Sequence, residues 1–141
     1  MKYSYQYPRP MVTVDMVVIA TSVSHSVLLI RRKNEPFAGR WALPGGFVDM
    51  NESLEIAAAR ELLEETGLSL ANLEQFKAYG NVDRDPRGRN IAVVFYSIIP
   101  EAVTVTGNDD AIEAGWFDVN DLPELAFDHK RIITDLLLKI Q

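Results

Sequence analysis

The chain has 141 residues, of which 48% are hydrophobic and 24% charged, as in an average globular domain. This length fits one domain over residues 1–141 with enough chain to bury a core. The net charge of −6 argues against general nucleic-acid binding, and the absence of cysteine excludes disulfides and thiolate metal sites. Since no apolar run resembles a signal peptide or approaches membrane-spanning length, we expect a cytoplasmic protein without a membrane partner.

The predicted elements begin with a start rich in tyrosine and proline, residues 1–10, which suits an extended arm or an edge strand. Apolar and β-branched runs predict six strands, at residues 11–20, 26–32, 41–43, 76–82, 91–99 and 114–119. Two helices are predicted, over residues 52–66, capped by Asn51 or Asp49 and stopped by Gly67, and over residues 127–140. Because strands and helices do not alternate regularly, the order predicts an α/β (α+β) sandwich with a mixed sheet.

The helix predicted over residues 52–66 places acidic side chains beside apolar ones. At about 100° per residue, it has two apolar lines, which predict packing on both sides; they are Leu54, Ala58 and Leu62, and Ile56, Ala59 and Leu63. Glu61, Glu64 and Glu65 share an arc of roughly 100° next to the first line. Because like charges repel at this spacing, they form either a solvated acidic face or a site for a hard cation such as Mg²⁺, which takes oxygen ligands and bridges phosphates.

Two neighbouring features favour the cation site. Arg60 is the only basic residue of this helix and suits a forked pair with a carboxylate. In the preceding loop, Gly45 and Gly46 allow the backbone to approach a ligand closely, and a carbonyl there is a further oxygen ligand. An ordinary turn is the alternative for the two glycines.

The spacing of these residues forms a longer pattern. Gly46 is followed after five residues by Glu52, and after seven more by the run RELLEETGL that begins at Arg60. This pattern resembles a complete Nudix box, and the strand order around it resembles the Nudix fold over nearly the whole chain. The resemblance implies an α/β/α sandwich with the box helix packed against a mixed sheet. It also implies an enzyme that cleaves a nucleoside diphosphate linked to another moiety, with Mg²⁺ or Mn²⁺ as cofactor.

The resemblance further implies roles for individual residues. As metal ligands it implies Glu61 and Glu65, supported by Glu64 and the Gly45 carbonyl. Arg60 and Glu52 form the orienting pair, and the positions with a structural role are Gly46, Glu52 and Gly67. The general base differs between family members, so it is either a box glutamate, Glu61 or Glu64, or an acid of a later loop, Glu113 or Asp110. These two later acids are equally well explained as surface side chains.

The segment 83–89, DRDPRGR, bears on the substrate. Proline and glycine alone explain a hairpin turn, but Arg84, Arg87 and Arg89 suit bidentate phosphate recognition. The segment resembles the ADP-ribose pyrophosphatase-like group, from which it departs at Arg89, where those relatives often have histidine. Arg32, at the end of a predicted strand, is a further candidate for contact with the substrate, as is Asp110. We expect His129 to be a capping or surface residue rather than a ligand.

The sequence therefore predicts a Nudix hydrolase whose partner is a small nucleotide, with ADP-ribose as the expected substrate. Nucleoside triphosphates, oxidised nucleotides and nucleotide sugars are alternatives with the same chemistry. A non-catalytic sensor that binds a nucleotide is the alternative from another class, but sensors of this type carry an additional DNA-binding module and often a degraded box. Family members are often homodimers, and the tyrosine-rich start offers a segment for pairing, so a homodimer is a candidate assembly.

Overall fold

The strand β1 (Met11–Ala20) lies at the centre of the sheet in the computed structural model, which describes residues 2–141. It runs parallel to β6 (Asn90–Ile99) along its whole length. Val14, Met16 and Val18 enter one core, whereas Val17 and Ile19 enter the core on the opposite face. Because both faces of β1 are covered, its sequence is almost continuously apolar.

The remaining strands are antiparallel to their neighbours. They are β2 (Ser26–Arg32) beside β1, β3 (Trp41–Ala42) and β7 (Ala111–Asp118) beside β2, β5 (Glu74–Tyr79) beside β6, and β4 (Gly45–Phe47) beside β1. The strand β2 pairs with β1 only at Ile19 and Ala20, while β4 occupies the place beside Thr13–Asp15. This change of neighbour separates β2 from β4 and creates room for a pocket at that end of the sheet.

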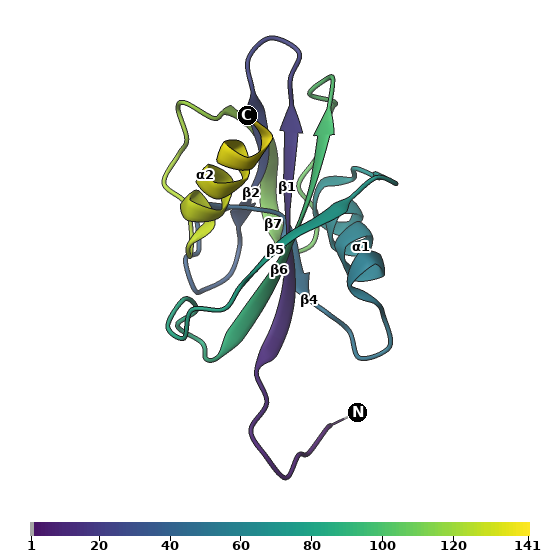
Figure 1. Cartoon of the computed structure of the whole chain (residues 1–141), viewed down its shortest axis with the longest axis vertical. Helices are drawn as coiled ribbons and strands as arrows, with labels where there is room; N and C mark the ends of the chain where they lie inside the picture. Colours follow the sequence, from purple (N-terminus) through teal and green to yellow (C-terminus); the bar gives the residue numbers. More distant parts are fainter. Residues whose placement is uncertain (1) are drawn as a thin grey trace.

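One helix covers each face of the sheet (Figure 1). The helix α1 (Leu54–Thr66) buries Ala57, Ala58 and Leu62 against one face. The helix α2 (His129–Ile140) buries Ile132, Ile133 and Leu136 against the other. The expected α/β/α sandwich with a mixed sheet and the box helix packed on it is therefore confirmed.

Helix α1 differs from the prediction at its start and on its outer side. It begins at Leu54 rather than at residue 52, because the Ser53 hydroxyl, and not Asn51 or Asp49, caps it by accepting a hydrogen bond from the Ile56 backbone N–H. At the other end, Gly67 adopts a φ of 74° and stops the helix as expected. The expectation of packing on both sides was wrong, since Ile56 and Leu63 remain 60% and 51% exposed.

Other boundaries shift for tertiary reasons. The strand β4 was expected to be loop, because two of its three residues are glycines and only pairing with β1 makes it a strand. Helix α2 begins at His129 and not at residue 127, since Phe127 has a φ of +52° that a helix does not accommodate. The arm over residues 2–10 forms no strand and leads away from the sheet, with its tyrosines exposed (Figure 1). Within residues 2–141, no helix is both long enough and apolar enough to cross a membrane.

Candidate active site

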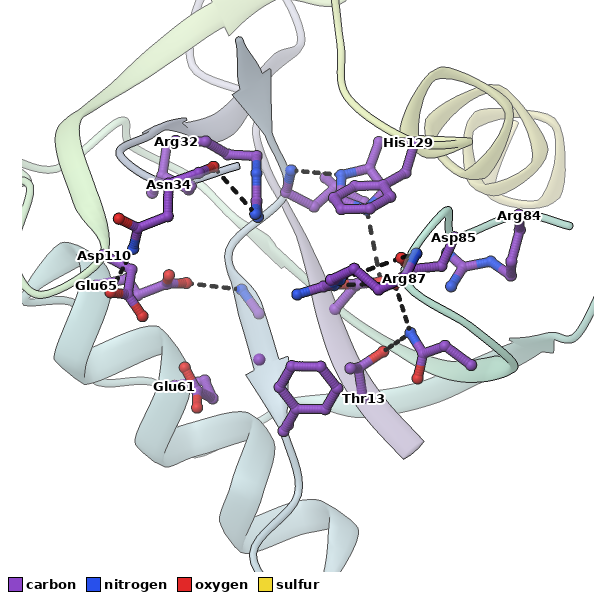
Figure 2. A pocket seen from close by; sticks show the side chains of 18 of the residues that line it. Thr13, Arg32, Asn34, Glu61, Glu65, Arg84, Asp85, Arg87, Asp110 and His129 are labelled. Atoms are coloured by element: carbon purple, nitrogen blue, oxygen red, sulfur yellow. Dashed lines mark hydrogen bonds and ion pairs between the residues drawn. The ribbon is translucent and has the colours of Figure 1, made fainter. Parts of the chain in front are cut away.

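A pocket of about 320 Å³ opens where β2 and β4 separate. Figure 2 shows that α1 lies on one side of β4 and α2 on the other, so the pocket spans both sides of this short strand. Its polar lining comes from distant segments of the chain and includes Glu61 and Glu65 of α1, Thr13 and Asp15 of β1, Arg32 of β2, Asn90 of β6, and Arg84, Asp85 and Arg87 of the loop between β5 and β6.

Two glutamates of α1 are held against β4. Glu65 is 5% exposed, and its Oε1 accepts a hydrogen bond of 2.7 Å from the Gly45 N–H. Gly46 lies so close to Glu61 that a Cβ there would be 2.5 Å from the carboxylate. Burial raises the pKa of Glu61, and burial together with the charges of Glu61, Asp15 and Asp110 raises the pKa of Glu65 to about 8. A buried pair of this kind gains from a neighbouring cation.

Arg60 holds the first of these carboxylates in place. Its Nη1 donates to Glu61 Oε1 at 2.8 Å and to Glu64 Oε2 at 3.2 Å. Its Nε and Nη2 form a fork with Glu52 at 2.9 and 2.5 Å. Hydrogen bonds from Arg60 and from the Asp49 N–H lower the pKa of Glu52 to about 2. Arg60 is therefore a positioning residue, because it orients Glu61 without lining the pocket.

Two predicted carboxylates lie outside the pocket. Glu64 turns toward Arg60 with a side chain that is 42% exposed, so the three box glutamates do not converge. Within residues 2–141, no three acidic or histidine side chains form a ready-made cation cluster. Glu113 forms an exposed ion pair with Arg31 at 3.1 Å, whereas Asp110 lines the pocket and accepts a hydrogen bond from Asn34.

Of the four arginines predicted to contact the substrate, three line the pocket and one does not. Arg32 and Arg87 both line the pocket, and their charges repel each other; burial, followed by the charge of Arg87, lowers the pKa of Arg32. Arg84 also lines it, but its guanidinium is committed to Asp128 through hydrogen bonds of 2.9 and 2.7 Å. Arg89 is exposed and donates to the Gly80 carbonyl, so the structure does not bring it to the site.

Aromatic rings that the sequence did not single out support the two arginines of the pocket. The guanidinium of Arg87 lies over the rings of Phe47 and Phe127, at 5.1 and 5.6 Å from their centroids. That of Arg32 lies 5.1 Å from the Phe127 centroid. Arg87 is further fixed by Asp85, which accepts hydrogen bonds from its Nε and Nη2. The two cationic groups are thus held in place before any anion binds.

His129 is neither a cap nor at the surface, contrary to the expectation, because the N-cap of α2 is Asp128 and His129 is 4% exposed. Its Nδ1 accepts a hydrogen bond of 3.0 Å from the Leu43 N–H, so the ring proton is on Nε2, 3.7 Å from Asp15 Oδ2. Burial lowers the pKa of His129 to about 3 and raises that of Asp15 to about 7. One signal of this site is visible in the sequence, since Asp15 is the only charged residue in the apolar run 11–20.

Substitution of His129 by glutamine is expected to change how stability depends on pH. The folded state keeps His129 neutral beside Asp15, Asp128, Arg84 and Arg32, while the unfolded chain binds a proton below about pH 6.5. Between pH 7 and pH 5, the free energy of unfolding of the wild type is therefore expected to fall by about 2 kcal/mol more than that of His129→Gln. Urea unfolding at both pH values measures this difference, and an equal gap at the two would contradict it.

Comparisons with known proteins agree with this fold. A family model described as the NUDIX domain matches residues 9–136. The ADP-ribose pyrophosphatase of Methanocaldococcus jannaschii is 46% identical, over 93% of this chain and 75% of the relative. The "ADPR responsive transcriptional repressor NtrR" of Acinetobacter baylyi is 34% identical, over 95% of this chain and 56% of the relative. The NUDIX domain of Shewanella oneidensis NrtR, solved with ADP ribose, superimposes with a TM-score of 0.90 at 31% identity, over 96% of this chain and 91% of that one.

The sandwich, the complete box and the matched family model together define the class of protein. This chain belongs to the Nudix family. It is a Nudix pyrophosphohydrolase, a hydrolase of phosphoanhydride bonds.

Proposed function

We propose that this chain hydrolyses ADP-ribose to AMP and ribose 5-phosphate with the help of Mg²⁺ or Mn²⁺. The observation that carries the proposal is the opposition, in one pocket, of two largely buried carboxylates, Glu61 and Glu65, and two guanidinium groups, Arg32 and Arg87. Such a site suits an anion that is held partly through a cation and partly through forked hydrogen bonds. The 46% identity to a protein named an ADP-ribose pyrophosphatase supports the choice of substrate.

The residues of the pocket fit a divalent metal. Glu61 and Glu65 supply hard carboxylate oxygens, the Gly45 carbonyl is a further donor, and Glu64 supports the set through Arg60. Mg²⁺ usually takes one or two carboxylates and keeps several waters, so three converging side chains are not required. When bound, the metal neutralises the diphosphate and lowers the pKa of a coordinated water.

The chain's own groups orient the diphosphate and accept a proton. Arg87, braced by Asp85, and Arg32, braced by the Pro36 carbonyl at 2.7 Å, hold the phosphate oxygens. An anion between them relieves their mutual repulsion, which favours binding. Because Arg60 holds Oε1 of Glu61, Oε2 is the free oxygen of this carboxylate, which would either bind the metal or accept the proton of the attacking water.

A panel of substrates tests this proposal. With Mg²⁺ present, we expect kcat/KM for ADP-ribose to exceed that for nucleoside triphosphates, oxidised nucleotides and nucleotide sugars by roughly tenfold or more, measured as AMP or phosphate released. Equal rates across the panel would remove ADP-ribose as the preferred substrate and leave the hydrolase. Calorimetric binding of ADP-ribose without any release of AMP would instead favour the sensor function that the name of the Acinetobacter relative suggests.

A further inference from the structure

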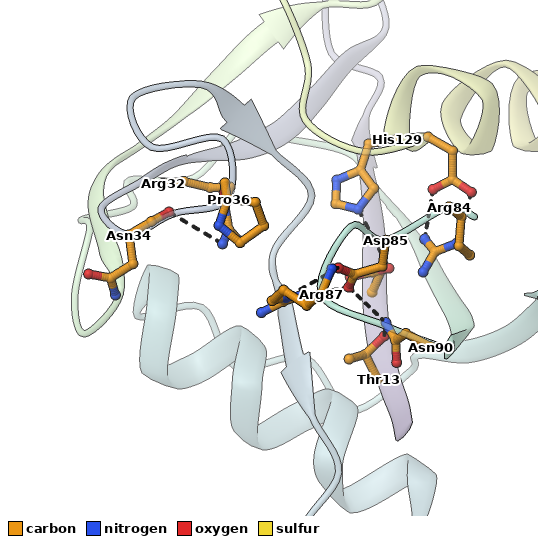
Figure 3. A network of polar contacts seen from close by, with 11 residues as sticks. Thr13, Arg32, Asn34, Pro36, Arg84, Asp85, Arg87, Asn90 and His129 are labelled. Carbon is orange, nitrogen blue, oxygen red and sulfur yellow. Dashed lines mark hydrogen bonds and ion pairs between the residues drawn. The ribbon is translucent and has the colours of Figure 1, made fainter. Parts of the chain in front are cut away.

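The side of the pocket that faces α2 carries polar groups whose hydrogen bonding is incomplete (Figure 3). Asn90 is 2% exposed, and its Oδ1 has no hydrogen-bond partner within residues 2–141. Asp15 and Thr13, at 7% and 6% exposure, point from the same face of β1 and line the same pocket. Buried polar atoms normally have a partner, so these groups require an explanation.

The orientation of the Asn90 amide follows from its neighbours. Its Nδ2 donates to Thr13 Oγ1 at 3.2 Å and lies 3.5 Å from Asp85 Oδ2. Burial alone would raise the pKa of Asp85, but hydrogen bonds from Arg87 outweigh it and the pKa is lowered. An ionised Asp85 only accepts hydrogen bonds, so Asn90 must turn its NH₂ group toward Asp85 and its oxygen away.

Asp15 is the second acceptor without a donor. The nearest basic nitrogen recorded beside it, His129 Nε2, is 3.7 Å from Oδ2, which is too far for a hydrogen bond. No hydrogen bond reaches the Asp15 carboxyl group from any side chain or backbone group of residues 2–141. The hydroxyl of Thr13 already accepts from Asn90, so its own proton remains to be donated. Asp15 and Thr13 therefore offer one acceptor and one donor to a ligand, beside Asn90, whose buried oxygen has no partner within residues 2–141.

This arrangement selects the kind of group that binds beside it. A phosphate is disfavoured, because the carboxylates of Asp15 and Asp85 repel anions. A purine ring is disfavoured as well, since guanidinium groups already lie over the rings of Phe47 and Phe127. Neighbouring hydroxyl groups of a sugar, which both donate and accept, complement Asp15 and Thr13, and Asn90 holds the Thr13 hydroxyl in place.

We propose that Asp15, Asn90 and Thr13 form a subsite that binds the hydroxyl groups of a ribose of the substrate. This inference rests on the proposed function only in that the substrate joins a diphosphate to a ribose. The diphosphate lies on the α1 side of β4, near Glu61 and Glu65, and the ribose lies on the α2 side. Arg87 lies between them, braced on Phe47 of β4 and on Asp85 (Figures 2 and 3).

Binding of non-hydrolysable analogues tests the subsite independently of turnover. The probes are α,β-methylene ADP-ribose, two analogues that lack one hydroxyl on the terminal or on the adenosine ribose, and the analogue with hypoxanthine in place of adenine. Calorimetry at pH 8 compares the wild type with Asp15→Asn and with Thr13→Val, which keeps the side-chain shape. Asp121→Asn is the matched control, because Asp121 is exposed and lies outside the pocket.

We expect Asp15→Asn to weaken binding of the parent analogue by about 10- to 100-fold, as for loss of a hydrogen bond to a charged acceptor, and Asp121→Asn to have no effect. Against one of the two deoxy analogues the effect of Asp15→Asn shrinks to less than about threefold, because the partner hydroxyl is absent. That pattern supports the subsite and identifies the ribose. If Asp15→Asn is unstable, Thr13→Val must show the same dependence on the missing hydroxyl.

Two outcomes overturn the proposal. In the first, Asp15→Asn weakens binding equally for the parent analogue and for both deoxy analogues, and does not weaken binding of the hypoxanthine analogue. That result would assign the subsite to the base. In the second, neither variant changes the affinity of any analogue. Failure of the proposed function is distinguishable from both, because the wild type would then either bind no ADP-ribose analogue at all or bind ADP-ribose without releasing AMP.

Discussion

Replacing Glu65 by glutamine is expected to lower kcat by roughly 10²- to 10⁴-fold, the range for loss of a group that holds a catalytic metal or moves a proton. The fold should persist, because the glutamine oxygen still accepts the hydrogen bond from the Gly45 N–H. The substitution also removes a carboxyl group whose charged form is disfavoured by burial, as its pKa of about 8 indicates. Steady-state release of AMP measures the loss of kcat, and thermal unfolding of the same samples tests whether the fold persists.

The matched control for this experiment is Glu55→Gln. Glu55 lies in the first turn of the same helix and is exposed, so Glu55→Gln changes the formal charge equally without approaching the pocket. Its kcat should remain within about twofold of the wild type. Full activity in Glu65→Gln would contradict the metal-site assignment, and a loss in both variants would show only a general effect of charge.

The two glycines of β4 are expected to respond differently to alanine. At Gly46 the three atoms nearest to the added Cβ all belong to the Glu61 carboxylate, which can move, so we expect the fold to tolerate alanine while the carboxylate is displaced. A misplacement of about 1 Å near the reacting atoms can cost about 10²-fold in rate, so we expect kcat of Gly46→Ala to fall by about that factor. At Gly45 the Cβ would overlap the Val14 carbonyl of β1 and Asp15 Oδ1. There β4 must separate from β1, which should lower stability by roughly 1–3 kcal/mol.

Gly80→Ala is the control for both substitutions, since its Cβ would lie 4.0 Å from Ile91, an ordinary contact. Measuring kcat and the unfolding midpoint of all three variants separates the two effects. The expectation for Gly46 is wrong if its alanine variant keeps normal turnover. The expectation for Gly45 is wrong if its variant unfolds at the same denaturant concentration as the wild type.

Local patterns in the sequence were sufficient for the class of fold and for several residues that the structure brings to the pocket. The box spacing identified Gly46, Glu61 and Glu65, because residues four apart on a helix share a face whatever surrounds them. The uninterrupted apolar run of β1 indicated a strand covered on both faces. Gly67 marked the end of α1 because only a left-handed backbone conformation closes it.

Spacing could not say which side chains meet across the fold. Arg87 and Arg89 are two residues apart, yet Asp85 and two aromatic rings hold Arg87 at the pocket while Arg89 turns to the Gly80 carbonyl. Glu64 and Glu113 were grouped with the catalytic acids, but each is paired with an arginine outside the pocket. Which partner a charged side chain takes depends on neighbours that are distant in sequence, and no local periodicity records them.

The sequence by itself therefore determined the family, because the box is a pattern of residue types at fixed spacing. It also determined the box helix and the pair of carboxylates on its inner face, because these depend on residues within about one or two helical turns. Only the tertiary structure decided that β4 is a strand, that His129 is buried, and that Asp15 and Asn90 line the pocket. The strand β4 and the pocket depend on the change of neighbour along β1 from β2 to β4, and residues from several parts of the chain surround that pocket.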